Sequence, residues 1–316
     1  MHELIDFLSQ PLAMELTSAR SFVASLREPS ARQQAVFPQP YVIDEDSMPV
    51  ELAAMETVGG GSKLTAIVPL WGVITMHGGW FSSSLNQFAS TITKLDQNEA
   101  IQTIIVHVNS PGGSVSGTIE AANALRAIRD RGATRTITVA EPMMASAATW
   151  IGTASAEVVV TPSGDAGSVG VISMYENWQK ALEMMGIEIN IMRSPANKAR
   201  FSGFEPLDDG MREVMQTRNA AAYGLFLEAM AKNRNVTAKQ AEKRFGNGEM
   251  LSAAEAKSEG LIDRIATFSE VLAGLSKKRS SGGVRAEDEV PETTAEVVPT
   301  AEELAAERRK RLEAVA

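Results

Sequence analysis

The sequence predicts an α/β fold with a largely parallel sheet and C-terminal helices. From about Lys63 onward, short apolar runs bounded by turn residues alternate with segments whose apolar residues recur at helical spacing. Such alternation is typical of stacked βαβ units, in which a helix joins two parallel strands. Residues 208–245 then keep a helical pattern without an intervening strand, so we expect long helices in the C-terminal part.

The elements follow in order along the chain. The apolar run of residues 66–74 predicts the first strand, and residues 84–98 suit a helix. Residues 101–108 predict a buried strand, and the helix expected over 116–131 closes at Gly132, because glycine is favoured just past a helix end. The other expected elements are strands at 136–140, 157–161, 168–173 and 187–193, helices at 145–155 and 174–185, and a helix, a short strand and a helix over 251–274.

Composition divides the chain into four predicted segments. Residues 1–62 indicate a lead-in, with short amphipathic helices over 1–30 and an irregular stretch after them. Residues 63–275 are expected to form the compact domain. Residues 276–299 lack apolar periodicity and predict a disordered acidic linker. Residues 300–316 predict a charged terminal helix, which begins with the capping-box pair Thr300 and Glu303 and could start a scaffold region.

Charge and residue counts exclude several classes of protein. With 30 basic and 39 acidic side chains the net charge is −9, and residues 286–307 hold eight of the acids and no base. The remainder is therefore close to neutral, whereas a nucleic-acid binder needs a basic face. The absence of cysteine excludes disulfides, thiolate metal sites and a cysteine nucleophile. Since the only histidines are His2, His77 and His107, a three-histidine metal site would need all of them, and we do not expect one.

No membrane segment is expected. The most apolar stretch, residues 64–76, is too short to span a bilayer and is interrupted by Pro69 and Gly72. The N-terminus has early acids and no basic region ahead of an apolar core, so it does not match a secretory signal. The sequence therefore predicts a cytoplasmic protein.

Clusters of small residues stand at the predicted strand ends, where open α/β sheets place their sites. Ser146 is expected where a strand gives way to a helix, beside backbone N–H groups that can stabilise an oxyanion. A serine nucleophile needs a base, and a lysine can serve when burial lowers its pKa. Lys198 lies in a loop of small and apolar residues. Taken singly, such a serine is usually a helix N-cap and such a lysine a solvated charge, so only the combination points to catalysis.

The combination resembles the signal peptide peptidase A family of serine peptidases, which shares the fold of the Clp protease subunit and of crotonases. The resemblance covers roughly residues 67–265. It rests on the Ser-Pro-Gly-Gly turn within Asn109–Gly113, the Ala-Ser-small-small segment Ala145–Ala148, the Gly-Ser-Val-Gly-Val segment Gly167–Val171, and the Ala-x-x-x-Gly-Leu-Ile-Asp stretch Ala256–Asp263.

The resemblance implies a role for five residues. Ser146 would be the nucleophile, Lys198 the general base, and Ser168 the residue that orients the lysine ammonium. The backbone N–H groups of Gly113 and Ala147 would form the oxyanion hole. The Clp subunit instead carries a histidine about 25 residues after its serine, where this chain has Val171, which argues against a Ser-His-Asp triad.

Within this family, a body without a membrane anchor and with an acidic tail resembles the prohead (capsid maturation) proteases of tailed phages. That likeness implies a homo-oligomeric Ser-Lys endopeptidase that cleaves scaffold, portal or capsid proteins, and itself, in the host cytoplasm. One alternative is a soluble cellular peptidase that degrades signal peptides or damaged proteins. Another is a non-enzymatic scaffold protein on an inactive protease fold. An acyl-CoA enzyme of the crotonase type fits poorly, because its usual catalytic acids are not evident beside the Gly113 turn.

Overall fold

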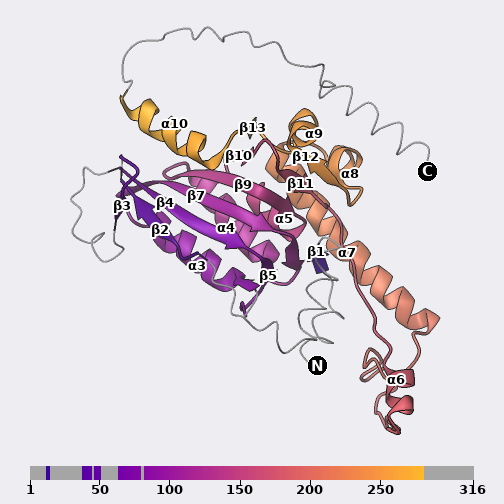
Figure 1. The fold of residues 1–316 in the computed structure, drawn as a ribbon. Helices are drawn as coiled ribbons and strands as arrows, with labels where there is room; N and C mark the ends of the chain where they lie inside the picture. Colours follow the sequence, from indigo (N-terminus) through magenta and orange to yellow (C-terminus); the bar gives the residue numbers. More distant parts are fainter. Residues whose placement is uncertain (1–11, 15–37, 45, 51–62, 80–81, 281–316) are drawn as a thin grey trace.

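The computed structural model describes residues 12–14, 38–44, 46–50, 63–79 and 82–280, which form two sheets with helices around them (Figure 1). The central sheet has the order β12-β11-β9-β7-β4-β2-β3, and β10 joins β9 to β13 beside this path. Its strands are β2 (Tyr41–Ile43), β3 (Pro49–Val50), β4 (Leu64–Trp71), β7 (Ile101–Ser110), β9 (Arg135–Ala145), β10 (Glu157–Val160), β11 (Asp165–Gly167), β12 (Met250–Ser252) and β13 (Arg264–Ile265).

The pairing confirms the predicted fold class. The pairs β4–β7, β7–β9, β9–β10, β9–β11 and β10–β13 are all parallel, whereas β2, β3 and β12 are antiparallel additions at the edges. A smaller sheet, in the order β1-β8-β5-β6, is built from β1 (Leu12–Met14), β8 (Gly112–Ser114), β5 (Val73–Thr75) and β6 (Ser82–Ser84).

Helices cover both faces of the central sheet. The described helices are α3 (Leu85–Asp96), α4 (Thr118–Arg131), α5 (Ala147–Gly152), α6 (Gln179–Met184), α7 (Asp209–Arg234), α8 (Ala238–Phe245), α9 (Ala253–Ser258) and α10 (Phe268–Ser280). Because side chains alternate along a strand, Ile104 and Val106 join the core shared with α3, α4 and α5, while Ile105 joins the smaller core under α10. None of these helices is both long and apolar enough to cross a membrane.

Three sequence predictions are wrong in the segment after β10. The strand expected at 168–173 is absent, and the strand there is Asp165–Gly167 instead. The helix expected over 174–185 is reduced to α6. Residues 187–193 form no strand, although Ile187, Ile189 and Met192 suggest one, because no neighbouring strand pairs with them and all three side chains are exposed. This part of the chain projects from the body with α6, past the N-terminal end of α7 (Figure 1).

The ends of the chain also differ from expectation where they are described. Residues 12–14 form a strand and not a helix, and β2 and β3 extend the central sheet from a stretch expected to be irregular. Helix α10 runs to Ser280, past the predicted start of the linker at 276. The rest of the linker and the expected helix over 300–316 lie outside the described residues, as does most of the segment 1–37.

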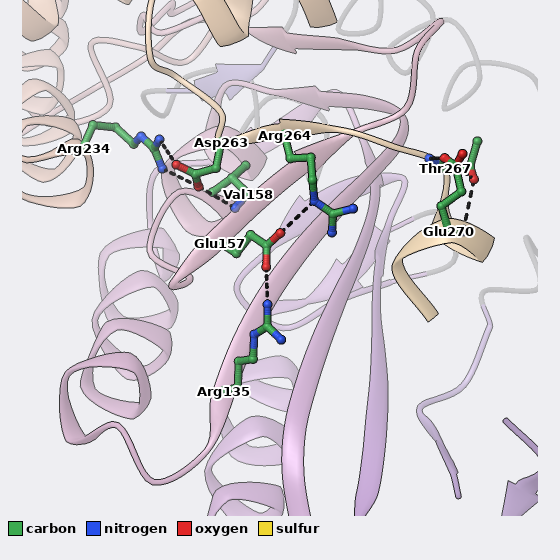
Figure 2. Close-up of polar contacts among 8 residues, drawn as sticks. All are labelled: Arg135, Glu157, Val158, Arg234, Asp263, Arg264, Thr267 and Glu270. Atoms are coloured by element: carbon green, nitrogen blue, oxygen red, sulfur yellow. Dashed lines mark hydrogen bonds and ion pairs between the residues drawn. The ribbon is translucent and has the colours of Figure 1, made fainter. Parts of the chain in front are cut away.

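The Ala256–Asp263 stretch attaches the C-terminal segment to β10 (Figure 2). Asp263 accepts a hydrogen bond from the Val158 backbone N–H at 2.8 Å and forms an ion pair with Arg234 at 2.6 Å. The Asp263 N–H in turn donates to the Val158 carbonyl at 2.9 Å. Beside it, Glu157 bridges Arg135 at 2.6 Å and Arg264 at 3.0 Å. This motif therefore has a structural role.

Replacing Asp263 by alanine is expected to lower the free energy of unfolding by about 2–3 kcal/mol, because the Arg234 side chain, only 10% exposed, would lose its charged partner. Thermal and urea unfolding would measure the change. Asp130→Ala is the matched control, since Asp130 is 58% exposed and its pair with Arg129 should contribute less than about 1 kcal/mol. Equal losses in both variants would contradict the assigned role of Asp263.

Candidate active site

Ser146 stands at the junction between β9 and α5. It is fully buried, and its backbone has φ 54° and ψ −115°, a combination that non-glycine residues rarely adopt. Two hydrogen bonds hold this turn: the Ser146 N–H donates to the Gly167 carbonyl at 2.8 Å, and the Trp150 N–H donates to the Ser146 carbonyl at 2.9 Å. The side-chain Oγ lies 3.5 Å from the Gly170 carbonyl, a distance at the long limit for a hydrogen bond.

Two backbone segments that could donate to an oxyanion lie beside this serine. Ala147 is the first residue of α5, so its N–H has no acceptor within the helix. Helix α5 also contacts β8, which contains Gly113. A Cβ at position 113 would come 1.8 Å from the Ile74 carbonyl oxygen, so only glycine allows β8 to approach β5 this closely. The Ser-Pro-Gly-Gly turn thus places β8, which has no side chain at Gly112 and Gly113, next to α5.

Ser168 lies on the other side of Ser146. It is 7% exposed, has a φ of 53°, and donates its N–H to the Glu249 carbonyl at 2.7 Å. Its neighbour Gly167 accepts the bond from the Ser146 N–H. Ser146, Ala147, Gly113 and Ser168 are therefore gathered at one end of the β7–β9–β11 region.

Thr149 is a positioning residue that the sequence did not single out. Its Oγ1 lies 2.7 Å from the Met144 carbonyl and 2.9 Å from the Gly167 carbonyl, so one buried hydroxyl joins β9, α5 and β11. It sits three residues after Ser146, inside the first turn of α5. A threonine in such a place has no pattern of its own in the sequence, since helix-start threonines are common caps.

No hydrogen bond joins Lys198 to Ser146 within the described residues. The Lys198 side chain is exposed, and its backbone N–H donates to Pro195 O at 2.9 Å in a loop between α6 and α7. We call residues 174–208 the arm. The arm is held together by the ion pairs Arg193–Glu205 and Arg200–Asp208 and by the bond from Tyr175 Oη to the Glu205 carbonyl. It projects with α6 away from the body that carries α5 (Figure 1).

The described histidines are engaged elsewhere. His107 Nε2 lies 3.1 Å from a Glu141 oxygen, and its ring stacks on Phe268 at a centroid distance of 4.4 Å, on the α10 side of the sheet. His77 is exposed, with Nδ1 3.2 Å from Asn86 Nδ2. In the part of the chain that the structure describes, no group of three or more potential metal-ligating side chains is placed to hold a metal ion.

His107 gives the fold a pH dependence. Burial lowers the pKa of His107 below its ordinary value, and the nearby Glu141 opposes this shift only in part. The unfolded chain therefore binds a proton at a higher pH than the folded chain does, so stability is expected to fall as the pH drops below the ordinary histidine range. Melting temperatures of the wild type and of His107→Gln between pH 8 and pH 5 would measure this. A wild-type decline no steeper than that of His107→Gln would contradict it.

Comparison with known proteins finds a similarity to one peptidase family. The model of peptidase family S49 matches residues 131–281, a range that includes Ser146, Ser168 and Lys198. Residues 131–281 are therefore similar to peptidase family S49. The strained Ser146 turn, the buried Ser168 and the exposed Lys198 all lie inside this matched region.

Two curated relatives illustrate the range of the similarity. Protease 4 of Haemophilus influenzae is 24% identical over 184 residues, which are 58% of this chain and 29% of the relative. Capsid assembly protease C of Escherichia phage lambda is 25% identical over 210 residues, which are 64% of this chain and 47% of the relative. The chain thus spans less than half the length of either. A crystal structure of the ClpP protease catalytic domain from Plasmodium falciparum aligns with a TM-score of 0.40 and 17% identity, over 64% of this chain and 85% of that one.

Proposed function

We propose that this chain is a serine endopeptidase of the S49 type with Ser146 as its nucleophile. The observation that carries the proposal is the backbone of Ser146, which is held at φ 54° between a strand and a helix start by bonds to its N–H and carbonyl. Backbone strain of this kind persists only where the surroundings impose it, and it concentrates at functional sites. The N–H groups of Ala147 and Gly113 would donate to the oxyanion that forms when Ser146 Oγ attacks a peptide carbonyl.

The base in this proposal is Lys198. Its neutral amine would accept the Ser146 hydroxyl proton as Oγ bonds to the carbonyl carbon, and the resulting ammonium would return the proton to the leaving amine. Water would then release the acyl group by the same steps. Ser168 would hold the lysine amine toward Ser146. No hydrogen bond joins Lys198 to Ser146 within the described residues, and Lys198 belongs to the arm, which projects with α6 (Figure 1). The dyad would therefore form through a movement of the arm or with the arm of a second copy.

In the cell, we infer a role in phage head assembly, with scaffold, portal or capsid proteins and the chain itself as substrates. The relative from phage lambda bears the name of a capsid assembly protease, which supports this role. The relative named Protease 4 supports the alternative of a cellular signal-peptide or protein-quality peptidase. The inferred assembly is a homo-oligomer in the host cytoplasm that uses no cofactor. A scaffold protein on an inactive protease fold is the non-enzymatic alternative.

A fluorophosphonate probe tests the nucleophile without knowledge of the substrate, because the phosphorus reacts covalently with an activated serine hydroxyl. Mass spectrometry of the labelled protein should find one modified residue, Ser146. Labelling should disappear in Ser146→Ala and persist in Ser110→Ala, since the Ser110 hydroxyl is bound to the Gly72 carbonyl at 2.6 Å. A folded wild-type protein that takes up no label and cleaves no denatured protein would favour the scaffold alternative.

A further inference from the structure

Strand β1 lies between two segments that border the candidate active site. Leu12–Met14 pairs antiparallel with Ser114–Gly112 on one side. On the other side, the Leu12 N–H donates to the Ile172 carbonyl at 2.8 Å, and the Ile172 N–H donates to the Leu12 carbonyl at 2.9 Å. In Figure 1, β1 lies apart from β2 and β3, the strands that come next in the chain. A three-residue strand therefore has hydrogen-bonding partners along both edges.

The two neighbours of β1, strand β8 and the segment at Ile172, both border the candidate active site. Gly113, in the middle of β8, is the proposed oxyanion donor, and the carbonyl of Gly170, two residues before Ile172, is the partner of Ser146 Oγ. Successive residues of an antiparallel strand direct their N–H and C=O groups to opposite sides. Because both groups of Leu12 face Ile172, those of Ala13 face its register partner Gly113. The Ala13 carbonyl is thus directed at the N–H that would stabilise an oxyanion.

Two side chains of β1 are also buried in the body. Leu12 is 0% and Met14 is 3% exposed. Residues two apart on a strand point to the same side, so the body buries two aliphatic side chains next to this backbone. An extended peptide that adds to a strand edge and inserts alternate side chains into pockets is a recurrent mode of peptide recognition.

We propose that β1 is an internal occupant of the substrate groove. The strand takes the place of an extended substrate peptide between β8 and the segment at Ile172, and a protein substrate with aliphatic residues two positions apart enters only when β1 leaves. The inference deepens the proposed function and rests on it for the identity of the groove. When a tethered segment occupies the groove, a second peptide binds only the chains whose groove is empty. Its apparent affinity is therefore the intrinsic affinity multiplied by the fraction of empty grooves.

The test is a binding measurement in the Ser146→Ala background, so that no cleavage occurs. The probe is a fluorescein-labelled peptide with the sequence of residues 8–18 of this chain, LSQPLAMELTS. Ala13→Pro removes the N–H that faces Gly113 and should release β1, while Ala13→Ser keeps the N–H and is the matched control. We expect the peptide to bind Ala13→Pro about tenfold more tightly than Ala13→Ser, as measured by fluorescence anisotropy.

Hydrogen exchange gives a second readout that does not depend on the peptide. The Ile172 amide should be protected in Ala13→Ser and exchange faster in Ala13→Pro, and addition of the peptide should restore its protection. Leu12→Asp, which places a charge in a fully buried position, should act like Ala13→Pro if that variant does not fold. Equal peptide affinities in the released and control variants would overturn the proposal, whatever the exchange at Ile172. Tighter peptide binding by Ala13→Pro would support the groove even if the fluorophosphonate probe fails to label Ser146 in the wild-type protein. That pair of results would reject the peptidase function alone.

Discussion

Ser146→Ala and Lys198→Ala should each reduce the cleavage of a denatured protein at least about 10³-fold, because nucleophile and base act as a unit. The expected loss for Ser168→Ala is smaller, about tenfold to a hundredfold, since that hydroxyl would only orient the lysine. Rates with unfolded casein, followed by release of labelled fragments, would measure all three variants. Their melting temperatures should stay close to the wild-type value, because none of these side chains has an ion pair within the described residues.

His77→Ala is the control for the choice of base. His77 is exposed, and its one described side-chain contact is with Asn86, so its loss should leave the rate within about twofold of wild type. An inactive His77→Ala beside an active Lys198→Ala would reject the dyad. Treatment with EDTA should also leave the rate unchanged, and inhibition reversed by added zinc would contradict the metal-free mechanism.

The sheet could be predicted from the sequence because its strands carry their own signals. Five of the eight residues 101–108 are apolar, as expected for a largely buried strand, and the segment forms most of β7. The helix at 116–131 has a glycine stop signal, and Gly132 indeed ends α4 with a φ of 71°. In both elements the local pattern and the tertiary burial favour the same structure.

The arm could not be predicted from such patterns. Ile187, Ile189 and Met192 suggest a strand, but a strand forms only where a partner supplies hydrogen bonds, and the described chain offers none there. The same reason explains β1, whose three residues become a strand through partners about 100 and 160 residues away in the chain. Local sequence contains no information about those partners.

Some residues of the candidate site could likewise be predicted from the sequence, and others could not. Ser146, Ala147 and Gly113 follow strands with strong signals, so the fold itself brings them to one edge. Ser168 follows β11, a strand that the sequence did not predict. Lys198 lies on the arm, where the expected strand over 187–193 does not form, so its position relative to Ser146 could not be predicted. Thr149 was missed because its hydroxyl acts through two carbonyls, Met144 and Gly167, that only the folded sheet brings together.

Mixing the two inactive variants should restore activity. The arm exposes apolar side chains, with Met184 89% and Met192 94% exposed, and α6 has no buried residue, so this surface is available for a neighbouring copy. If the arm of one copy delivers Lys198 to the Ser146 of the next, the contact is of the head-to-tail kind. Equal amounts of Ser146→Ala and Lys198→Ala, unfolded and refolded together, would then give about a quarter of the sites an intact serine and an intact lysine.

The recovered rate is therefore expected to approach about a quarter of the wild-type rate, more than a hundredfold above either variant alone. Refolding Ser146→Ala with the Ser146→Ala, Lys198→Ala double variant is the matched control, because that mixture contains no intact serine and should remain inactive. Light scattering of the same samples should show an oligomer. Absence of recovery at every mixing ratio, in samples that do form mixed oligomers, would show that the lysine acts on the serine of its own chain. The arm would then have to close onto its own body, and the distance between labels on residue 198 and on α5 should shorten when a phosphonate is bound.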